Sequence, residues 1–280
     1  MKIGFFGINS GPLATDPDLA TAVAQHAEQA GLDSVWAGEH MCVPTPQAPP
    51  SPLGPTDPML DPIPALAWAA AHTTTLRIGT GVLLLPQRNP VALAKEIASL
   101  DVLSKGRVLL GVGIGYLEPE FRAVGASMER RGERTMEYVA AMKALWGMDK
   151  PAYHGEFVSF DGIDAYPRPM RPQGPPIVMG GHAAAAFRRA VQGADEWYGF
   201  RCDVARTQAC VEGLAKAKER YGLANGTDRL VISITPAKPL SSDLVQQYAD
   251  LGVDRLIVLT SNGDLDHYRR FIDDNAAFIS

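Results

Sequence analysis

The segment "RVLLGVGIGYLEPEF", residues 107–121, decides between two kinds of α/β fold. It places Gly111, Gly113 and Gly115 directly after a run of apolar, β-prone residues. A glycine-rich turn after a strand is typical of Rossmann domains, but there it follows the first strand of its unit and runs straight into a helix. Here three strand–helix units come first, Pro119 interrupts the next segment, and no acidic residue ends a second strand about 20 positions on. The dinucleotide interpretation is therefore weak.

Strand-like and helix-like patterns alternate along the whole chain. Apolar, β-prone runs predict strands at residues 2–8, 33–38, 76–85, 107–113, 176–180, 195–200, 229–235 and 254–260. The first predicted helix begins after Asp16, its N-cap. Four more helices are predicted at residues 63–72, 89–106, 131–146 and 204–221. Three others contain Phe187 and Val191, Leu244 and Tyr248, and Tyr268 and Ile272. Eight such units predict a (β/α)8 TIM barrel in one domain spanning residues 1–280. An open, doubly wound sheet is the alternative if two units are spurious.

A recurring joint supports the barrel. The segments "AGLDSVW", "QGADEWY" and "LGVDRLI" each end a helix on glycine and place an aspartate two residues later, at the next strand. Glycine at that position accepts the left-handed conformation that closes a helix. We therefore expect left-handed glycines at Gly31, Gly193 and Gly252.

Two insertions interrupt the alternation. Residues 41–64 follow the second strand and are so rich in proline that they predict a long non-helical loop over the face where the strands end. Residues 152–176, between the fourth helix and the fifth strand, predict a small hairpin and an extended proline-rich run. Since this insertion follows a helix, its start is expected on the opposite face unless it wraps around.

Charge and composition exclude several classes of function. The net charge is −5 with no long basic run, which argues against nucleic acid and anionic membranes as main partners. Cys42, Cys202 and Cys210 are scattered without C-x-x-C spacing, so neither a disulfide framework nor a zinc site is expected. The sequence has no apolar run near the roughly 20 residues of a membrane span and no signal-peptide layout. We expect a cytoplasmic protein with a small-molecule substrate and no metal.

The segment "GVGIGYLEPEFRAVG", preceded by "IGTGVLLLPQRNPVALAKEIASLDVLSKGR", resembles the bacterial luciferase-like family. Its members are barrel oxidoreductases that use FMN or the deazaflavin F420. The resemblance covers the first five strands and is closest to the actinobacterial branch assigned to F420. It also implies a homodimer.

The resemblance implies a catalytic role for His40. In "AGEHMC", Glu39 and His40 end the second strand, and the family pattern implies that His40 faces the isoalloxazine-type ring and the substrate. A histidine there could take the hydroxyl proton of an alcohol while hydride leaves its carbon. The alternative is a structural histidine bonded to a loop carbonyl. Glu39 is interpreted as a structural residue that is paired within the mouth, the end of the barrel where the strands finish.

Two glycine-containing segments are the candidate cofactor wall. "IGTGVLLLP" matches the segment in which this family carries a non-prolyl cis peptide, expected here between Gly81 and Val82, so Thr80, Gly81 and Val82 are assigned to the back of the ring. "MGGHAAAAFRRA" places Gly180, Gly181 and His182 at the start of a helix, where exposed N–H groups bind phosphate. The backbone of Gly113 and Gly115 is expected to contribute. The alternative for the first segment is an ordinary strand with a trans peptide, and the alternative for the second is a plain strand-to-helix turn.

Tyr116 departs from the pattern of sugar-phosphate-oxidising relatives, which carry a glutamate acid there. It is a candidate to stack on the cofactor or donate its hydroxyl, or it fills the loop core. Glu118 and Glu120 are interpreted as solvated or loop-capping. Arg88 either pairs with a polyglutamate tail or is a surface charge, and the face in "ERRGERTMEY" is interpreted as solvated.

These observations favour an oxidoreductase that moves hydride between a small organic substrate and C5 of F420. An FMN monooxygenase that uses oxygen is the alternative within the family, since its ring pocket would look alike. From other classes, a non-catalytic flavin- or deazaflavin-binding protein stays open. A lyase or isomerase would need a lysine at a strand end, and no lysine sits convincingly there.

Overall fold

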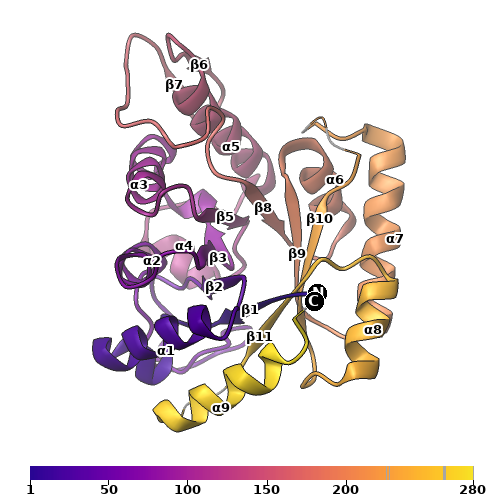
Figure 1. Cartoon of the computed structure of the whole chain (residues 1–280). Helices are drawn as coiled ribbons and strands as arrows, with labels where there is room; N and C mark the ends of the chain where they lie inside the picture. Colours follow the sequence, from indigo (N-terminus) through magenta and orange to yellow (C-terminus); the bar gives the residue numbers. More distant parts are fainter. Residues whose placement is uncertain (225, 227, 261–262, 280) are drawn as a thin grey trace.

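Eight parallel strands close into a barrel in the computed structural model of the chain, which describes all residues except 225, 227, 261, 262 and 280 (Figure 1). β1 pairs with β11 on one side and β2 on the other, and the pairing of β3 with β5 completes the ring. The barrel strands are β1 (Lys2–Phe6), β2 (Ser34–Ala37), β3 (Arg77–Thr80), β5 (Val108–Gly113), β8 (Ile177–Gly180), β9 (Glu196–Cys202), β10 (Val231–Pro236) and β11 (Arg255–Leu259). The closed ring confirms the (β/α)8 prediction and excludes the open sheet.

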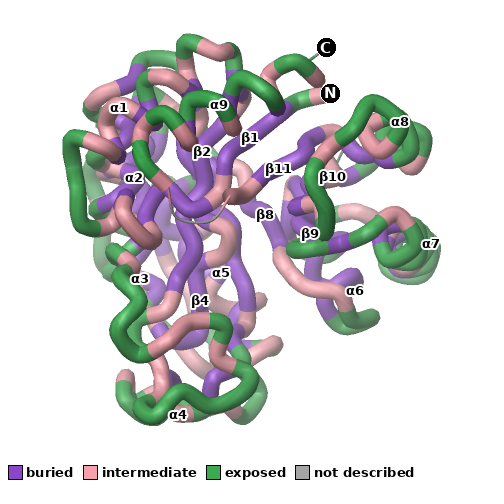
Figure 2. Tube along the Cα trace, turned by 90° about the horizontal axis from the view of Figure 1, so that it is seen from below, coloured by how far each residue is buried: buried purple, intermediate pink, exposed green. Residues whose placement is uncertain are grey.

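A long helix follows each barrel strand and covers the outside of the ring (Figures 1 and 2). These helices are α1 (Pro17–Gln29), α2 (Pro62–Ala71), α3 (Pro90–Leu103), α5 (Arg131–Gly147), α6 (Ala184–Gly193), α7 (Val204–Tyr221), α8 (Ser242–Asp250) and α9 (Leu265–Ala276). Shorter elements lie in the connections, namely the 3-10 turns η1 (Gly11–Ala14) and η2 (Leu85–Gln87), strands β4 (Leu83–Leu84), β6 (Tyr153–His154) and β7 (Ser159–Phe160), and helix α4 (Glu118–Ala123). Within the described residues, no helix is long and apolar enough to cross a membrane.

The helix starts follow the capping signals of the sequence. The Asp16 carboxylate accepts hydrogen bonds from the N–H groups of Asp18 and Leu19, at 3.1 and 3.0 Å. Asn89 caps α3 in the same way, and proline occupies the first helical position in both helices. Proline fits there because the first N–H groups of a helix have no helical partner.

The same rule corrects the prediction for residues 41–64. The last three of these, 62–64, form the first turn of α2 and include two prolines, so the insertion is non-helical only up to Asp61, the N-cap. The end of α3 also differs from expectation. α3 ends at Leu103, before the predicted Gly106, because Lys105 and Gly106 both adopt positive φ.

The glycine joints are only partly as predicted. Gly31 and Gly252 have φ of +83° and +79°, the left-handed conformation expected of them. Gly193 does not, and it ends α6 as an ordinary helical residue. A Cβ at Gly193 would lie 2.6 Å from Met136 Cε, so this glycine is required for close packing of α6 on α5.

The aspartates of the joints close the end of the barrel where the strands begin. Asp195 and Asp254 accept 2.8 Å hydrogen bonds from the N–H groups of Ile177 and Ile232 on neighbouring strands. Asp33 instead binds Arg255 Nε at 2.6 Å. Arg255 is fully buried and also binds Glu196 at 2.7 Å, so an ionic group fills this end of the barrel interior.

Above this ionic group, the barrel interior is apolar. Trp36, Leu109, Val178, Tyr198 and Ile257 form a buried cluster drawn from five strands, with Phe6 and Val82 partly buried against it. A larger buried cluster includes residues of both the strands and the outer helices. The strands are accordingly drawn as mostly buried in Figure 2. Phe6 and Val82 therefore form the top of the interior, at the end where the strands finish.

The second insertion wraps back toward that same end. β6 and β7 pair antiparallel, as predicted. Their connecting turn is bound by Glu137 of α5, whose carboxylate accepts hydrogen bonds from Phe157 and Val158 N–H at 2.6 and 2.8 Å. Glu156 pairs with Arg130, immediately before α5. Since α5 begins at the face where the strands end, the tip of the hairpin reaches that face.

Candidate functional site

His40 follows β2 and lies between a carboxylate and a phenol. Its Nδ1 is 3.4 Å from Glu120 Oε2, and its Nε2 is 3.4 Å from the Tyr116 hydroxyl. The His40 and Tyr116 rings meet edge to face, with centroids 5.8 Å apart. The two predicted catalytic residues are thus brought together, and the structure adds Glu120 as a third member.

Glu120 was predicted to be solvated or loop-capping, and the first alternative is wrong. Its side chain is 1% exposed, and its Oε1 accepts a 2.7 Å hydrogen bond from Met41 N–H. Glu120 lies on the buried side of α4, whereas Glu118 on the same short helix stays at the surface and pairs with Arg122. A buried carboxylate at Nδ1 favours the tautomer with the proton on Nδ1, which leaves Nε2 as an acceptor.

Tyr116 is 45% exposed at the other side of His40. Partial burial, and secondarily the Glu120 charge, raise the pKa of its hydroxyl. The hydroxyl therefore stays protonated at neutral pH and can donate to Nε2. Together the three groups form a line from a buried carboxylate to the surface of the mouth.

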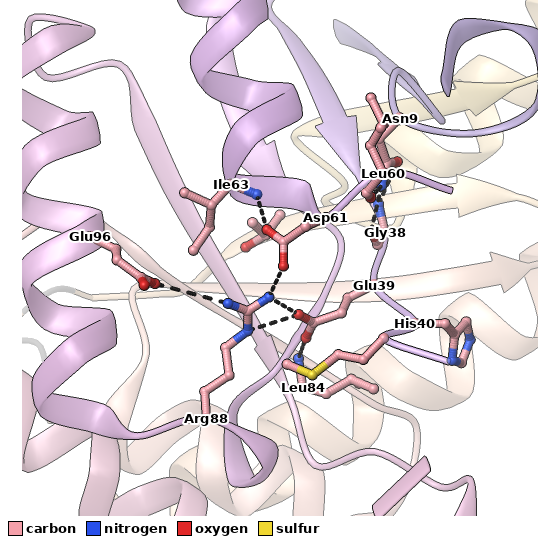
Figure 3. Close-up of polar contacts among 12 residues, drawn as sticks. Asn9, Gly38, Glu39, His40, Leu60, Asp61, Ile63, Leu84, Arg88 and Glu96 are labelled. Carbon is pink, nitrogen blue, oxygen red and sulfur yellow. Dashed lines mark hydrogen bonds and ion pairs between the residues drawn. The ribbon is translucent and has the colours of Figure 1, made fainter. Parts of the chain in front are cut away.

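Glu39 points away from His40, into an ionic cluster (Figure 3). It is buried and binds Arg88, whose Nε lies 2.8 Å from Glu39 Oε1, and it accepts a hydrogen bond from Leu84 N–H. Arg88 also binds Asp61, the N-cap of α2. Burial raises the pKa of Glu39, although Arg88 opposes this shift. The structural interpretation of Glu39 is confirmed. The surface-charge interpretation of Arg88 is wrong because its guanidinium is largely buried and paired with Glu39 and Asp61, and the pairing with a polyglutamate tail stays a prediction.

Asn9 anchors the proline-rich loop and was not found from sequence. Its side chain is fully buried, and Nδ2 donates to the carbonyl oxygens of Gly38 and Leu60 at 2.8 and 2.7 Å (Figure 3). Oδ1 accepts from Gly38 N–H at 3.2 Å. Asn9 thereby fixes the backbone directly before Glu39 and His40. The available signal was a lone amide directly after a predicted strand.

The ring-facing wall is built differently from expectation. The peptide bond between Gly81 and Val82 is cis, as the family pattern implied, and it lies between β3 and β4. Cβ atoms at Gly113 and Gly180 would lie 2.6 and 3.0 Å from the Val82 methyl groups, so Val82 packs against both glycines. The glycines thus make room for protein side chains. A ring would rest on Val82 and Phe6 rather than on bare backbone.

The other two glycines of the opening segment also serve internal packing. A Cβ at Gly111 would lie 1.8 Å from the Thr80 carbonyl oxygen, and Thr80 Oγ1 donates to the Gly111 carbonyl at 2.6 Å. Gly115 has φ of +71°, and its Cβ would lie 2.5 Å from the Phe121 ring. Thr80 is buried beneath the wall and not on its surface.

Aromatic and amide side chains lie around the mouth. Phe200, 39% exposed, lies 5.5 Å from Phe6 between ring centroids, and the exposed Tyr116 lies beside His40. Gln87 is buried with both carboxamide atoms unpartnered, and its Nε2 lies 3.7 Å from the Cβ position of Gly115. An unpartnered buried amide beside the glycine turn calls for a polar partner that the described protein does not supply.

Gly180 and Gly181 lead into α6, as predicted, and Gly181 has φ of +120°. The His182 side chain turns toward β9, where Nε2 accepts a 3.1 Å hydrogen bond from Phe200 N–H. Arg206 Nη2 lies 3.1 Å from Nδ1. Burial, with a further contribution from Arg206, lowers the pKa of His182. Any phosphate contact from this residue would therefore come from its backbone.

The predicted solvated face at residues 129–138 is only partly exposed. Arg134 is buried, stacks on Phe157 and donates to the carbonyl oxygens of Ser127 and Glu129, both at 2.9 Å. Arg131 donates to the carbonyl oxygen of Gly115 at 3.2 Å. These arginines order the connection between β5 and α5.

Comparison with known proteins decides the family. Residues 3–274 match the family model described as luciferase-like monooxygenase. The chain belongs to this family. An uncharacterized protein of Mycobacterium tuberculosis is 32% identical over 91% of this chain and 92% of its own length. An F420-dependent glucose-6-phosphate dehydrogenase of Amycolatopsis mediterranei is 30% identical over 87% of this chain and 65% of its own length.

Solved structures agree on the fold. A monooxygenase of Streptomyces bottropensis superposes with a TM-score of 0.79 at 20% identity, covering 99% of this chain and 98% of that one. An F420-dependent secondary alcohol dehydrogenase, in complex with an F420–acetone adduct, gives the same TM-score and coverage at 17% identity. The luciferase-like chain is thus an oxidoreductase whose relatives use flavin or deazaflavin cofactors.

Proposed function

We propose that this protein is an F420-dependent oxidoreductase that transfers hydride between a small organic substrate, such as a secondary alcohol or its ketone, and C5 of the deazaflavin. The observation that carries the proposal is the line Glu120–His40–Tyr116 at the mouth of the barrel. The Amycolatopsis relative, named as F420-dependent, supports the choice of cofactor.

The residues of the mouth divide into a binding wall and a proton site. Val82 and Phe6 would support one face of the ring, Gln87 would meet a polar group, and the start of α6 after Gly181 would hold the phosphate. When bound, the deazaflavin ring accepts or donates one hydride at C5.

His40 would manage the accompanying proton. In alcohol oxidation the hydride leaves the carbinol carbon, the hydroxyl proton passes to His40 Nε2, and the carbonyl product forms. Glu120 holds the protonated Nδ1 and stabilises the imidazolium that results. Tyr116 donates to Nε2 in the resting site and to the substrate oxygen when substrate lies between them.

This acid–base line favours hydride transfer over oxygen activation. Oxidation of an alcohol releases a proton at the substrate oxygen, so it requires a base at hydrogen-bonding distance from that oxygen. His40 is 10% exposed, and its Nε2 accepts only from the Tyr116 hydroxyl, which a substrate hydroxyl can replace. The FMN monooxygenase is the competing function, since a trigonelline monooxygenase component of Acinetobacter baylyi is 30% identical over 61% of this chain.

A turnover assay tests the proposal. Purified protein is incubated with a panel of secondary alcohols and F420 without oxygen, and loss of the deazaflavin absorbance is followed; a second set contains reduced FMN and oxygen. We expect turnover only in the first set and its loss in His40→Gln. Oxygen-dependent conversion with FMN alone would contradict the proposal.

A further inference from the structure

One arginine joins three segments that are far apart in the chain (Figure 3). Arg88 follows the short turn η2, and its Nε lies 2.8 Å from Glu39 Oε1, while its Nη2 binds both Glu39 and Asp61. Its Nη1 is 3.9 Å from Glu96 Oε2, on α3. The side chains of Arg88 and Glu39 are only 12% and 1% exposed, whereas those of Asp61 and Glu96 are 41% and 49% exposed. The Glu39–Arg88 pair is therefore the buried centre of this group.

The two carboxylates that share Arg88 Nη2 stand at the two ends of the proline-rich loop. Glu39 lies two residues after the end of β2, and Asp61 ends the loop as the N-cap of α2. Asn9 binds the carbonyl oxygens of the residues directly before these two. The ends of the loop are thus tied together twice, directly beside His40.

Glu39 also binds the strand that carries the ring-facing wall. The second oxygen of its carboxylate, Oε2, accepts a hydrogen bond from the N–H of Leu84, a residue of β4 that follows Val82 by two positions. A single peptide bond joins Glu39 to His40. One carboxylate, held by Arg88, therefore connects the backbone of His40 with the strand of the wall.

Charge keeps this connection in place. A buried carboxylate is costly unless a cation and hydrogen-bond donors compensate it, and Arg88 is the cation that Glu39 meets. Without Arg88, Glu39 would take up a proton or turn toward solvent, and either change would weaken its bond to Leu84. Lysine is a poor replacement for Arg88, because only the planar guanidinium can donate to Glu39 from Nε and Nη2 at once.

We propose that the Glu39–Arg88 pair is a positioning group that sets the spacing between His40 and the ring-facing wall at Val82. Oxidation of an alcohol moves a hydride to the ring and a proton to the base from adjacent atoms of one substrate, so the two acceptors must be held at a fixed separation. The Glu39 side chain points away from His40, and the pair therefore acts through the backbone (Figure 3). Its effect on catalysis rests on the proposed function, whereas the connection itself does not.

Three variants separate the pair from its surroundings. Arg88→Met keeps the apolar stem and removes the charge. Arg88→Lys keeps the charge and loses the planar fork, and it is the milder change should Arg88→Met fold poorly. The control is Glu96→Gln, which alters the exposed partner of the same arginine on α3.

Hydrogen exchange measures the connection without any cofactor. The Leu84 amide donates to Glu39, so we expect it to exchange about tenfold faster or more in Arg88→Met than in wild type, the worth of one charge-assisted hydrogen bond. Arg88→Lys should lie between the two, and Glu96→Gln should match wild type. Equal exchange of Leu84 in Arg88→Met and Glu96→Gln would overturn the proposal.

A single-turnover measurement tests the effect on catalysis. Each protein, in excess over F420, is mixed without oxygen with a secondary alcohol that wild type oxidises, and reduction of the deazaflavin is followed. We expect the rate constant to fall by about tenfold or more in Arg88→Met, since a small displacement of reacting groups is costly, and by less in Arg88→Lys. Glu96→Gln should stay within about twofold of wild type, as for other exposed charges.

This rate constant does not depend on how much of the protein is folded, so a merely structural role would leave it unchanged. Equal rate constants for Arg88→Met and Glu96→Gln would overturn the positioning role even if exchange at Leu84 is faster. If wild type reduces no deazaflavin, the proposed function fails. The exchange of Leu84 then decides by itself whether the pair holds the segment of His40 to the wall.

Discussion

His40 Nδ1 lies 3.4 Å from the carboxylate of Glu120, a residue 80 positions later in the chain. Glu120 is held in place by Met41 N–H and is sealed from solvent, so the carboxylate cannot turn away. The pairing fixes which nitrogen of His40 faces the mouth. It makes Glu120 a positioning residue that acts through His40.

Glu120→Gln should therefore lower kcat with little change in KM. A carboxamide keeps the shape but loses the charge that stabilises the imidazolium, and a charge-assisted hydrogen bond is worth about 1.5–3 kcal/mol, or roughly 10- to 100-fold in rate. The pH profile of kcat/KM should shift as well, which a purely structural role would not produce. Glu118→Gln, an exposed change on the same short helix, serves as the control. Equal profiles for both variants would contradict the assignment.

Tyr116→Phe tests the third member of the line. Loss of the hydroxyl removes a donor to His40 Nε2 and to the substrate oxygen, so we expect kcat to fall by about 5- to 10-fold, the worth of one hydrogen bond. Because partial burial and Glu120 raise the pKa of Tyr116, the alkaline limb of the wild-type profile should not report this phenol below its ordinary pKa of 10. An alkaline limb below pH 10 that is present in wild type and disappears in Tyr116→Phe would contradict the raised pKa of Tyr116.

Arg255→Met should strongly destabilise the barrel. Arg255 is fully buried between Asp33 and Glu196, and its removal leaves two carboxylates without their cation. Breaking such a group typically costs about 3–5 kcal/mol, which urea unfolding monitored by circular dichroism would measure. The exposed Arg269→Met should stay within about 0.5 kcal/mol of wild type. A similarly small change for Arg255→Met would show that this end of the barrel tolerates the loss.

Glu28 gives the fold a defined acid sensitivity. Its partial burial opposes ionisation, but the N–H groups of Thr75, Leu76 and Thr74 outweigh it and lower the pKa of Glu28 from 4.5 to about 2. Because the folded pKa lies below the unfolded one, the stabilisation is complete above about pH 4.5 and is lost as the pH falls toward 2.

Glu28→Gln should accordingly lower the free energy of unfolding by about 1–2 kcal/mol at pH 7, a value reduced for solvent screening. The difference between variant and wild type should shrink as the pH falls from 4.5 to 2. Urea titrations at several pH values measure this, with the exposed Glu219→Gln as the reference. A difference that is constant with pH would contradict the role of the Glu28 charge.

Sequence patterns sufficed for the barrel because each strand–helix unit carries local signals. The caps at Asp16 and Asn89, the buried strand runs and the aspartate joints depend on residues close together in the chain. Gly193 shows the limit, since its glycine is required by Met136 on another helix and not by a left-handed turn.

The site was less predictable because its key contacts join distant segments. His40 and Tyr116 were found through the family pattern, but Glu120 looked like any charged residue in "YLEPEF" until the fold placed it at Nδ1. The sequence likewise carried no sign that Arg189 is buried, because the burial depends on the packing of its side chain against Gly132 of α5. The three glycines of the opening segment were interpreted as bare backbone for a ring, whereas in the structure they make room for Thr80, Val82 and Phe121.

The most direct test of the central claim is a side-by-side fluorescence titration of the purified protein with F420 and FMN. The account predicts saturable binding of F420 at micromolar concentration or tighter, with FMN at least about tenfold weaker. Tighter binding of FMN would contradict the deazaflavin assignment and favour an oxygen-using monooxygenase. Binding of neither by a folded protein would contradict the cofactor site itself.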